Sequence, residues 1–421
     1  MFSFLMPYIL QGTIPMNYLE YLIYAYSLYI IIKIFISYNQ ISFIKQKLQA
    51  KAVLLDAEKY AKAGAYSISK EKLSIVEGVI DFALFAAWVL FGFAYIETLI
   101  VETGYTEPIL KAILFIMAFM LVNFALSLPL SIYKSFGLDK TYEFSTNLTP
   151  ATFIKDTLKG GVLFIVLAPL LIGALAYFIE NVQHWWLYSF VVLFSFIVLV
   201  NIFYPLIRAK MFDKFSPLPE GELRDSIETL MDKVNFKSQG IFTVDASKRD
   251  SRLNAYFGGL GKSKRVVLFD TLIEKLSQNE LISVLGHELG HFKHGDILKN
   301  IALMGTILLG LFWGISHIPH ELAAQMGISF GSHFIIIVFL FLSSLVFFVL
   351  MPIINLLSRH NEYAADEFGS EMGSSEDLAS ALIKLVNENL SFPHSHPLYV
   401  FFYYSHPPLL ERLDALGHKL D

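Results

Sequence analysis

The residues best suited to chemistry are His287, Glu288 and His291, which form a His-Glu-x-x-His motif. Residues four apart project from nearly the same face of an α-helix, so the two imidazoles can hold one metal ion together. Glu288 lies beside them, close enough to reach a water bound to that metal. Two histidine ligands, a third ligand elsewhere and a carboxylate base are the parts of a zinc hydrolase. We therefore expect one Zn²⁺ per chain, with His287 and His291 as ligands and Glu288 as the catalytic base.

The context of this motif favours a buried functional helix over a surface helix with two solvated histidines. Ser277 is followed three residues later by Glu280, the pattern of a capping box at a helix start. The residues around the motif, from Leu281 to Gly290, are mostly apolar or small. The sequence therefore predicts a helix that begins near Ser277 and is buried along the motif.

A candidate third ligand follows further along the chain, where Glu362 and Asp366 are four residues apart. Both would face one way on a helix. One carboxylate could bind the metal while the other accepts the free ring N–H of a ligand histidine and fixes its orientation. We expect Glu362 to be the ligand and Asp366 the partner of the histidine, with His360 and Glu367 as rival ligands. The alternative without a role in metal binding is that these charges form the solvated face of a helix.

Two further histidines lie near these motifs. His294 comes three residues after His291, but no glycine and third histidine follow at metzincin spacing, so we expect a structural role for it. His406 is followed by Pro407 and Pro408, which fix the direction of the chain. An imidazole presented in this way could donate a hydrogen bond to a developing oxyanion. A loop histidine without a role is the alternative.

The composition predicts an integral membrane protein. The chain has 421 residues, of which 55% are hydrophobic, and its mean hydropathy is +0.54. Only 16% of the residues are charged, against roughly 25% in soluble domains. The net charge of -5 suggests no nucleic-acid partner. Because there is no cysteine, any metal must be held by His, Asp or Glu. We expect no cleaved signal peptide, since the first residues lack a basic region and a clear cleavage site.

Seven apolar runs approach or exceed the roughly 20 residues needed to cross a bilayer. A short interfacial segment is expected at 1–15, before the first of them. The predicted spans are 18–37, 76–99, 109–132, 161–178, 186–207, 297–318 and 334–357.

Positive charge is concentrated in every second connection between these spans. Basic loops are expected at Lys45–Lys72 and Lys134–Lys159, and 208–296 and 358–421 are also polar. The positive-inside rule places these segments in the cytoplasm and the N-terminus outside. The membrane would be a bacterial inner membrane or an endoplasmic reticulum membrane, depending on the organism.

The chain therefore divides into four parts. Residues 1–207 would hold five spans and their loops, 208–296 the metallopeptidase core, 297–357 the last two spans, and 358–421 a tail with the third ligand and His406. Within the spans, Asp81, Asn123 and Asn201 could face a polar interior or form hydrogen bonds between helices.

The polar core contains two strand-like runs, 240–245 and 265–269. Asn254, Ala255 and Tyr256 lie between them. Zinc peptidases often bind an extended peptide as an added strand at the edge of a sheet. We expect these three residues to be that substrate-binding edge, with an ordinary hairpin as the alternative.

Taken together, these motifs resemble the membrane zinc metalloproteases of the Ste24 type, the CAAX prenyl proteases of peptidase family M48. The motifs that carry the resemblance are Phe136 to Lys159, Asp245 to Phe257, Val267 to Leu272, His287 to His291, Asn361 to Asp366, and Ser405 to Pro408.

The resemblance implies a mainly α, polytopic membrane protein: about seven transmembrane helices around a chamber, with a small α+β zinc metallopeptidase domain of the gluzincin-like kind. It implies zinc ligands at His287, His291 and Glu362. Catalytic roles would fall to Glu288 as base, Asp366 as partner of a ligand or proton donor, and His406 as an oxyanion or substrate contact. The substrate would be a prenylated protein that loses its C-terminal tripeptide, or another membrane-associated peptide, with membrane lipid around it.

Three other readings remain. His294-Gly295-Asp296 is also similar to the HtpX branch of the family, which favours a membrane quality-control protease with no prenyl requirement. A transporter or channel would account for the spans but not for the metal set. An inert chaperone with a vestigial site is disfavoured because Glu288 is intact.

Overall fold

Seven helices long and apolar enough to cross a membrane are found in the computed structural model, which describes residues 17–105, 107–258 and 264–418. This confirms the predicted mainly helical, polytopic fold; the interfacial segment expected at 1–15 lies outside the described residues. The spanning helices are α2 (Tyr18–Lys47), α3 (Ala57–Ala87) continued by α4 (Phe93–Glu102), α5 (Pro108–Ile132), α7 (Pro150–Asn181), α8 (Trp185–Met211), α12 (Asp296–Ile315) and α14 (Ser332–Met372).

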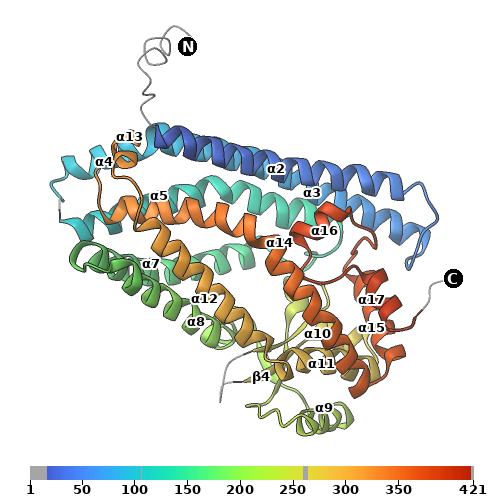
Figure 1. The fold of residues 1–421 in the computed structure, drawn as a ribbon. Helices are drawn as coiled ribbons and strands as arrows, with labels where there is room; N and C mark the ends of the chain where they lie inside the picture. The colour runs from blue at the N-terminus through green and yellow to red at the C-terminus, as the bar shows by residue number, and fades with distance from the viewer. Residues whose placement is uncertain (1–16, 106, 259–263, 419–421) are drawn as a thin grey trace.

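The helices extend well beyond the predicted spans, and the two predicted basic loops are largely helical. Lys59, Lys62, Lys70 and Lys72 lie on α3, which runs antiparallel to α2 along one edge of the molecule (Figure 1). The second basic segment is taken up by the π-helical turn η2 (Tyr133–Leu138), by α6 (Asp139–Thr141) and by the start of α7. Hydropathy marks where a helix can meet lipid, but Ala, Lys and Glu continue it into water.

Side-chain caps fix where these helices begin. Asp56 accepts a hydrogen bond from the Lys59 backbone N–H at 2.8 Å, which starts α3. Thr149 accepts from the Thr152 N–H at 3.1 Å and is followed by a proline in the first turn of α7. Each cap satisfies backbone donors that the first turn leaves unpaired.

The membrane-spanning half has an aromatic core, in which Phe85, Phe93, Phe115 and Phe341 are almost fully buried. Asn123 accepts a hydrogen bond from the Trp88 indole at 3.3 Å, so for this residue hydrogen bonding between helices is confirmed. Asp81 and Asn123 also line a cavity of about 350 Å³. Asn201 donates to the Ile197 carbonyl of its own helix at 2.8 Å.

The polar half contains a four-stranded sheet of order β1-β2-β4-β3. Its strands are β1 (Phe215–Pro217), β2 (Ile241–Val244), β3 (Ala255–Gly258) and β4 (Arg265–Phe269), which confirms the two predicted strands. β2 and β4 are parallel, whereas β3 pairs antiparallel with β4 and forms one edge of the sheet, with β1 at the other. β3 is therefore both an edge strand and one arm of a hairpin, so the two alternatives posed for this segment describe the same structure.

Shorter helices pack around this sheet. They are α9 (Glu222–Lys233), α10 (Asp270–Lys275) and α11 (Gln278–Lys293) before the sixth span, α13 (Glu321–Gln325) between the last two spans, and α15 (Ser375–Glu388), α16 (Pro397–Tyr403) and α17 (Leu409–Ala415) after them. α11 lies against the lower part of α14 and against α15 (Figure 1). The long helix α14 thus runs from the membrane-spanning half directly into the site.

Candidate metal and peptidase site

The helix that carries the His-Glu-x-x-His motif begins where the sequence predicts. Ser277 Oγ accepts a hydrogen bond from the Glu280 N–H at 3.3 Å, and the Ser277 N–H donates to Glu280 Oε2 at 2.7 Å. This reciprocal pair is the expected capping box at the start of α11. The helix is buried along the motif, as predicted from its apolar and small residues.

Glycines let α11 and α14 cross at very short range. A methyl group added at Gly290 would lie 3.0 Å from the Ala365 Cα, and one added at Gly369 would lie 2.9 Å from the His287 backbone nitrogen. Such distances leave no room for a side chain between the two helices. The crossing therefore holds the histidines of α11 opposite the carboxylates of α14.

Opposite the histidines lies Glu362. Its Oε1 is 3.3 Å from His291 Nε2, and its Oε2 is 3.6 Å from His287 Nε2. One ligand atom from each of these three residues lies within 4.8 Å of the others. The rivals His360 and Glu367 are exposed, while Glu362 is buried. The structure thus brings together the three residues predicted as ligands.

The buried carboxylate of Glu362 provides a test of whether a metal fits. Its Oε2 atom is buried and has no hydrogen-bond partner among the described residues. Burying a carboxylate oxygen without a hydrogen bond is costly unless a cation lies against it, and the guanidinium of Arg412 approaches this oxygen only to 3.8 Å. Two imidazole nitrogens and a carboxylate that converge on one point are a donor set suited to Zn²⁺. The residues present therefore fit a metal ion.

Carboxylates lie against the outer nitrogens of both histidines. Asp366 Oδ1 lies 2.8 Å from His287 Nδ1, in the position predicted for it, and Asp296 Oδ2 lies 3.1 Å from His291 Nδ1. A carboxylate at Nδ1 fixes the tautomer in which Nε2 is free to bind a metal. The role of Asp296 was missed by the sequence reasoning, although it stands five residues after His291 in the His-Gly-Asp turn. Gly295 makes that turn possible, because its φ of +72° is the left-handed conformation that ends α11.

Arg412 is a second residue that the sequence reasoning missed. Its Nε donates to Asp366 Oδ2 at 2.8 Å and its Nη2 to Oδ1 at 2.5 Å, while Nη1 lies 3.8 Å from Glu362 Oε2. The side chain is buried, in the last turn of α17. A buried arginine paired in this way neutralises one of the two carboxylates of α14. The available signal was a lone arginine among leucines just after the two prolines.

Glu288 and His406 complete the inner set. Burial raises the pKa of the Glu288 carboxyl, although the neighbouring His287 and His291 act in the opposite direction. His406 Nε2 lies 3.3 Å from Glu362 Oε1, and its Nδ1 is 2.9 Å from Ser405 Oγ. Partial loss of hydration lowers the pKa of His406, although its side chain is 59% exposed and Glu362 acts in the opposite direction. His294 stays outside the cluster, with its ring 6.2 Å from that of Phe368.

The predicted substrate edge lies beside the helix that carries the two histidines, because β3 packs against α11. Ala255 and Tyr256 belong to β3, and Asn254 directly precedes it. Asn389 makes two hydrogen bonds to the backbone of Leu253, just before Asn254. Its Oδ1 accepts from the Leu253 N–H at 2.8 Å, and its Nδ2 donates to the Leu253 carbonyl at 3.3 Å. The edge strand is therefore held at its start by an amide from the end of α15.

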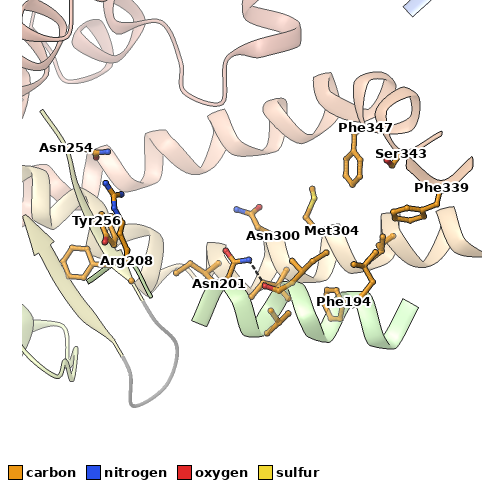
Figure 2. A pocket seen from close by; sticks show the side chains of 18 of the residues that line it. Phe194, Asn201, Arg208, Asn254, Tyr256, Asn300, Met304, Phe339, Ser343 and Phe347 are labelled. Carbon is orange, nitrogen blue, oxygen red and sulfur yellow. Dashed lines mark hydrogen bonds between the residues drawn. The ribbon is translucent and has the colours of Figure 1, made fainter. Parts of the chain in front are cut away.

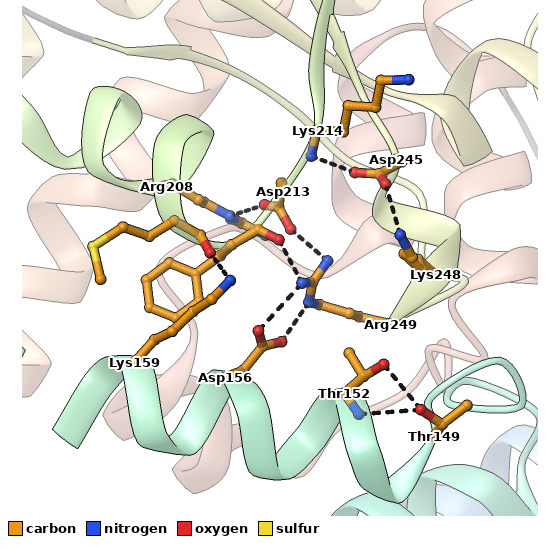
Figure 3. A network of polar contacts seen from close by, with 12 residues as sticks. Thr149, Thr152, Asp156, Lys159, Arg208, Asp213, Lys214, Asp245, Lys248 and Arg249 are labelled. Carbon is orange, nitrogen blue, oxygen red and sulfur yellow. Dashed lines mark hydrogen bonds and ion pairs between the residues drawn. The ribbon is translucent and has the colours of Figure 1, made fainter. Parts of the chain in front are cut away.

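Two arginines before β3 tie this strand to the membrane-spanning helices. Arg249 donates to Asp156 of α7 at 2.8 Å and to Asp213, just after α8, at 2.9 Å (Figure 3). Arg208 of α8 pairs with the same Asp213. Because Asp213 is buried, these cations are its balancing charges.

Arg252 makes the second connection. Its Nη2 lies 2.8 Å from Asp139 Oδ1 and 2.6 Å from the Tyr66 hydroxyl, and its guanidinium stacks 4.0 Å from the ring centre of Phe144. These partners belong to α6, α3 and the loop before α7. Both arginines stand in a motif singled out in the sequence, but their partners were not foreseen.

Seven apolar helices and a buried His-His-Glu cluster define a multi-pass membrane protein with a metallopeptidase centre. Comparison with known protein families agrees with this class of protein. Residues 40–214 match the family model described as the CAAX prenyl protease N-terminal domain of five membrane helices, and residues 217–420 match peptidase family M48. The chain belongs to peptidase family M48, as the sequence resemblance indicated, and it is a metalloprotease.

Similar proteins cover most of the chain. A CAAX prenyl protease 1 homolog from Arabidopsis thaliana is 30% identical over 406 residues, which cover 92% of this chain and 94% of that protein. The homolog from Homo sapiens is 32% identical and covers 86% of this chain and 87% of its own length. The crystal structure of S. mikatae Ste24p superposes with a TM-score of 0.87 at 27% identity, covering 96% of this chain and all of that one.

Proposed function

We propose that the protein is a zinc endopeptidase that cleaves near the C-terminus of prenylated, membrane-tethered proteins. The observation that carries the metal part is the convergence of His287, His291 and Glu362 around a buried carboxylate oxygen with no hydrogen-bond partner among the described residues. Zinc is the metal that this nitrogen and oxygen set favours. When bound, zinc supplies Lewis acidity and makes water a better nucleophile at neutral pH.

The side chains around the metal have separate roles in proton transfer, oxyanion binding and orientation of the ligands. Glu288 accepts the proton of the attacking water and passes it to the leaving amine, and its raised pKa suits a group that both takes and gives a proton. His406 donates a hydrogen bond to the oxyanion that develops on the peptide carbonyl. Asp366 and Asp296 hold the two imidazoles in register, and Arg412 balances the charge of Asp366.

The peptide binds in extended form along β3. An edge strand offers unpaired backbone donors and acceptors, so a substrate peptide added as a strand gains main-chain hydrogen bonds. Recognition then depends little on the side chains of the peptide. Asn254, Ala255 and Tyr256 form the stretch of this edge that we assign to the substrate. Broad side-chain selectivity follows from that mode of binding.

The metallopeptidase half faces the cytoplasm in this proposal, because the positive charge between spans lies on the same side. Single cysteines test the arrangement cleanly, since the chain has none of its own. Lys51→Cys lies between α2 and α3, and Tyr105→Cys lies between α4 and α5. An impermeant thiol reagent should label these two positions from opposite sides; labelling from one side would overturn the topology.

The lipid part of the proposal rests on the relatives, which are named CAAX prenyl proteases. Its test compares a prenylated CAAX peptide with its unmodified twin at matched concentration below KM. The wild type should cleave the prenylated peptide with a clearly higher kcat/KM, and Glu288→Ala should cleave neither. Equal rates on the two peptides would remove prenyl recognition and favour the general quality-control reading.

Metal content separates the ligands from the base. Glu362→Ala should lose much of the zinc, because three protein ligands become two. Glu288→Ala should keep the zinc and lose turnover. Unchanged zinc in Glu362→Ala, measured by mass spectrometry, would show that Glu362 is not a ligand.

A further inference from the structure

An apolar groove lies between the helices α8, α12 and α14 and ends at the edge strand β3 (Figure 2). Its volume is about 920 Å³. One wall is a helical stripe on α12 formed by Ile297, Ile301, Met304 and Leu308. These positions are spaced by three or four residues, so they share one face of that helix.

The character of the groove changes along its length. At the β3 end it is lined by Arg208, Asn254 and Tyr256, and further along by Met304, Phe339 and Phe347 (Figure 2). The far end lies among segments apolar enough to span a membrane. A ligand that fits must therefore have a polar end at the sheet and a long apolar end among the helices.

The groove also begins next to the catalytic centre. Ile297 directly follows Asp296, whose carboxylate contacts the ligand histidine His291. Asn254 and Tyr256 belong both to the groove lining and to the edge assigned to the peptide. From Ile297 to Leu308 the stripe on α12 is about 16 Å long, at about 1.5 Å per residue. That length suits an extended apolar chain, whereas an amino-acid side chain would fill only the first part.

We propose that this groove binds the isoprenoid chain of the substrate while the attached peptide adds to β3. The inference deepens the proposed function and rests on it, because it assigns the lipid of that substrate to named residues. Each methylene group removed from water adds to affinity, so a longer chain should bind more tightly until the groove is full. The polar residues at the β3 end then mark where chain and peptide join.

Bulky residues at the far end of the groove test this assignment. Met304→Trp and Leu308→Trp should lower kcat/KM for a farnesylated peptide by at least tenfold, mainly through KM. The same variants should cleave the unmodified peptide, and a peptide with one short isoprene unit, at the wild-type rate. The matched control is Leu298→Trp, on the exposed face of the same helix, where the leucine is 66% exposed. It should leave all three substrates unchanged.

Chemical modification of a cysteine in the folded protein tests the groove without depending on whether a tryptophan variant folds. Met304→Cys would be the only cysteine in the chain, and it can be assayed before and after reaction with alkyl thiosulfonates of increasing length. Longer alkyl groups should progressively abolish the advantage of the farnesylated peptide and spare the bare one. Leu298→Cys, treated in the same way, is the control.

The outcomes separate the groove from the proposed function. A wild type that cleaves no peptide contradicts the peptidase proposal itself. A wild type that prefers the farnesylated peptide, with blocked variants that keep the full preference, overturns only the groove assignment. Blocking that slows bare and farnesylated peptides equally also overturns it, because the groove would then hold bilayer lipid or support the fold.

Discussion

The two halves of the candidate site are held in different ways. The metal half depends on contacts at van der Waals range between two helices, where Gly290 and Gly369 leave no space for a side chain. The substrate half depends on Arg249 and Arg252, whose partners Asp156 and Asp139 are 93 and 113 residues away in the chain. Steric contact fixes the positions of ligands to within a fraction of an ångström, whereas charged pairs fix the placement of a whole strand. Damage to the first should therefore abolish chemistry, and damage to the second should weaken substrate binding.

The largest effect is expected from a side chain between the two metal-binding helices. Gly290→Val should separate α11 from α14, because even a methyl group would lie 3.0 Å from the Ala365 Cα. A displacement of about 1 Å at a catalytic centre can cost about 100-fold in rate. We expect at least that loss in kcat, together with reduced zinc content by mass spectrometry.

The control for this variant is Gly310→Val on α12. Apart from the backbone of its own helix and its chain neighbours, nothing lies within 4 Å of a methyl group added at Gly310, so this substitution should change neither zinc content nor kcat. Wild-type zinc and kcat in Gly290→Val would show that the helix crossing is not what sets the ligand geometry.

The next effect concerns the charge behind the metal cluster. Arg412→Met leaves the buried Asp366 carboxylate without its strongest partner. Losing a residue that orients a metal ligand typically costs 10- to 100-fold in metal affinity or activity, and we expect a loss of about this size. Zinc titration and kcat should show it, with KM almost unchanged. Arg224→Met, which removes an exposed pair with Glu228, is the control and should have no effect on either. A change in KM alone would place Arg412 in the substrate half instead.

A smaller effect, confined to KM, is expected from the arginines before β3. Arg249→Met breaks the links to Asp156 and Asp213. Charged hydrogen bonds of this kind contribute about 1.5–3 kcal/mol, so we expect KM for an unmodified peptide to rise roughly tenfold. Zinc content and kcat should stay at the wild-type level. A fall in zinc content would show instead that the strand's charged pairs also hold the metal ligands in place, so that the two halves are not independent.

The sequence predicts the metal half better than the substrate half, for a physical reason. Helical spacing places His287 with His291 and Glu362 with Asp366, because residues four apart share a face whatever the tertiary fold. The capping box at Ser277 and the number of spans follow from equally local rules.

What the sequence could not supply depends on tertiary contacts. Arg412 finds Asp366, and Arg249 finds Asp156, only once distant helices are packed together. The lengths of α3 and α7 were also underestimated, because hydropathy detects lipid-facing residues and not the lysine-rich turns that continue a helix into water. Asp296 was within reach of a sequence argument, since the histidine–carboxylate contact recurs wherever histidine binds a metal.

The smallest effect should come from the end of α11 that lies far from the metal. Burial alone would raise the pKa of Glu280, but hydrogen bonds from Lys384, Ser380 and Ser277 outweigh it and lower the pKa to about 2. A carboxyl whose pKa is lower in the folded state stabilises the fold above its unfolded pKa, and that contribution is lost as pH falls from about 4.5 toward 2. Because Lys384 is 42% exposed, we expect this carboxylate to contribute only about 1–2 kcal/mol to the free energy of unfolding at pH 7.

Thermal unfolding in detergent should therefore show Glu280→Gln less stable than wild type at pH 7, with the difference shrinking as the pH approaches 3. Acid release of the metal affects both proteins alike and cancels in that difference. Lys275→Met, which removes a more exposed pair with Glu388, should show no such trend. A stability difference between Glu280→Gln and wild type that stays constant from pH 7 to pH 3 would mean that the charge of Glu280 does not stabilise α11 against α15.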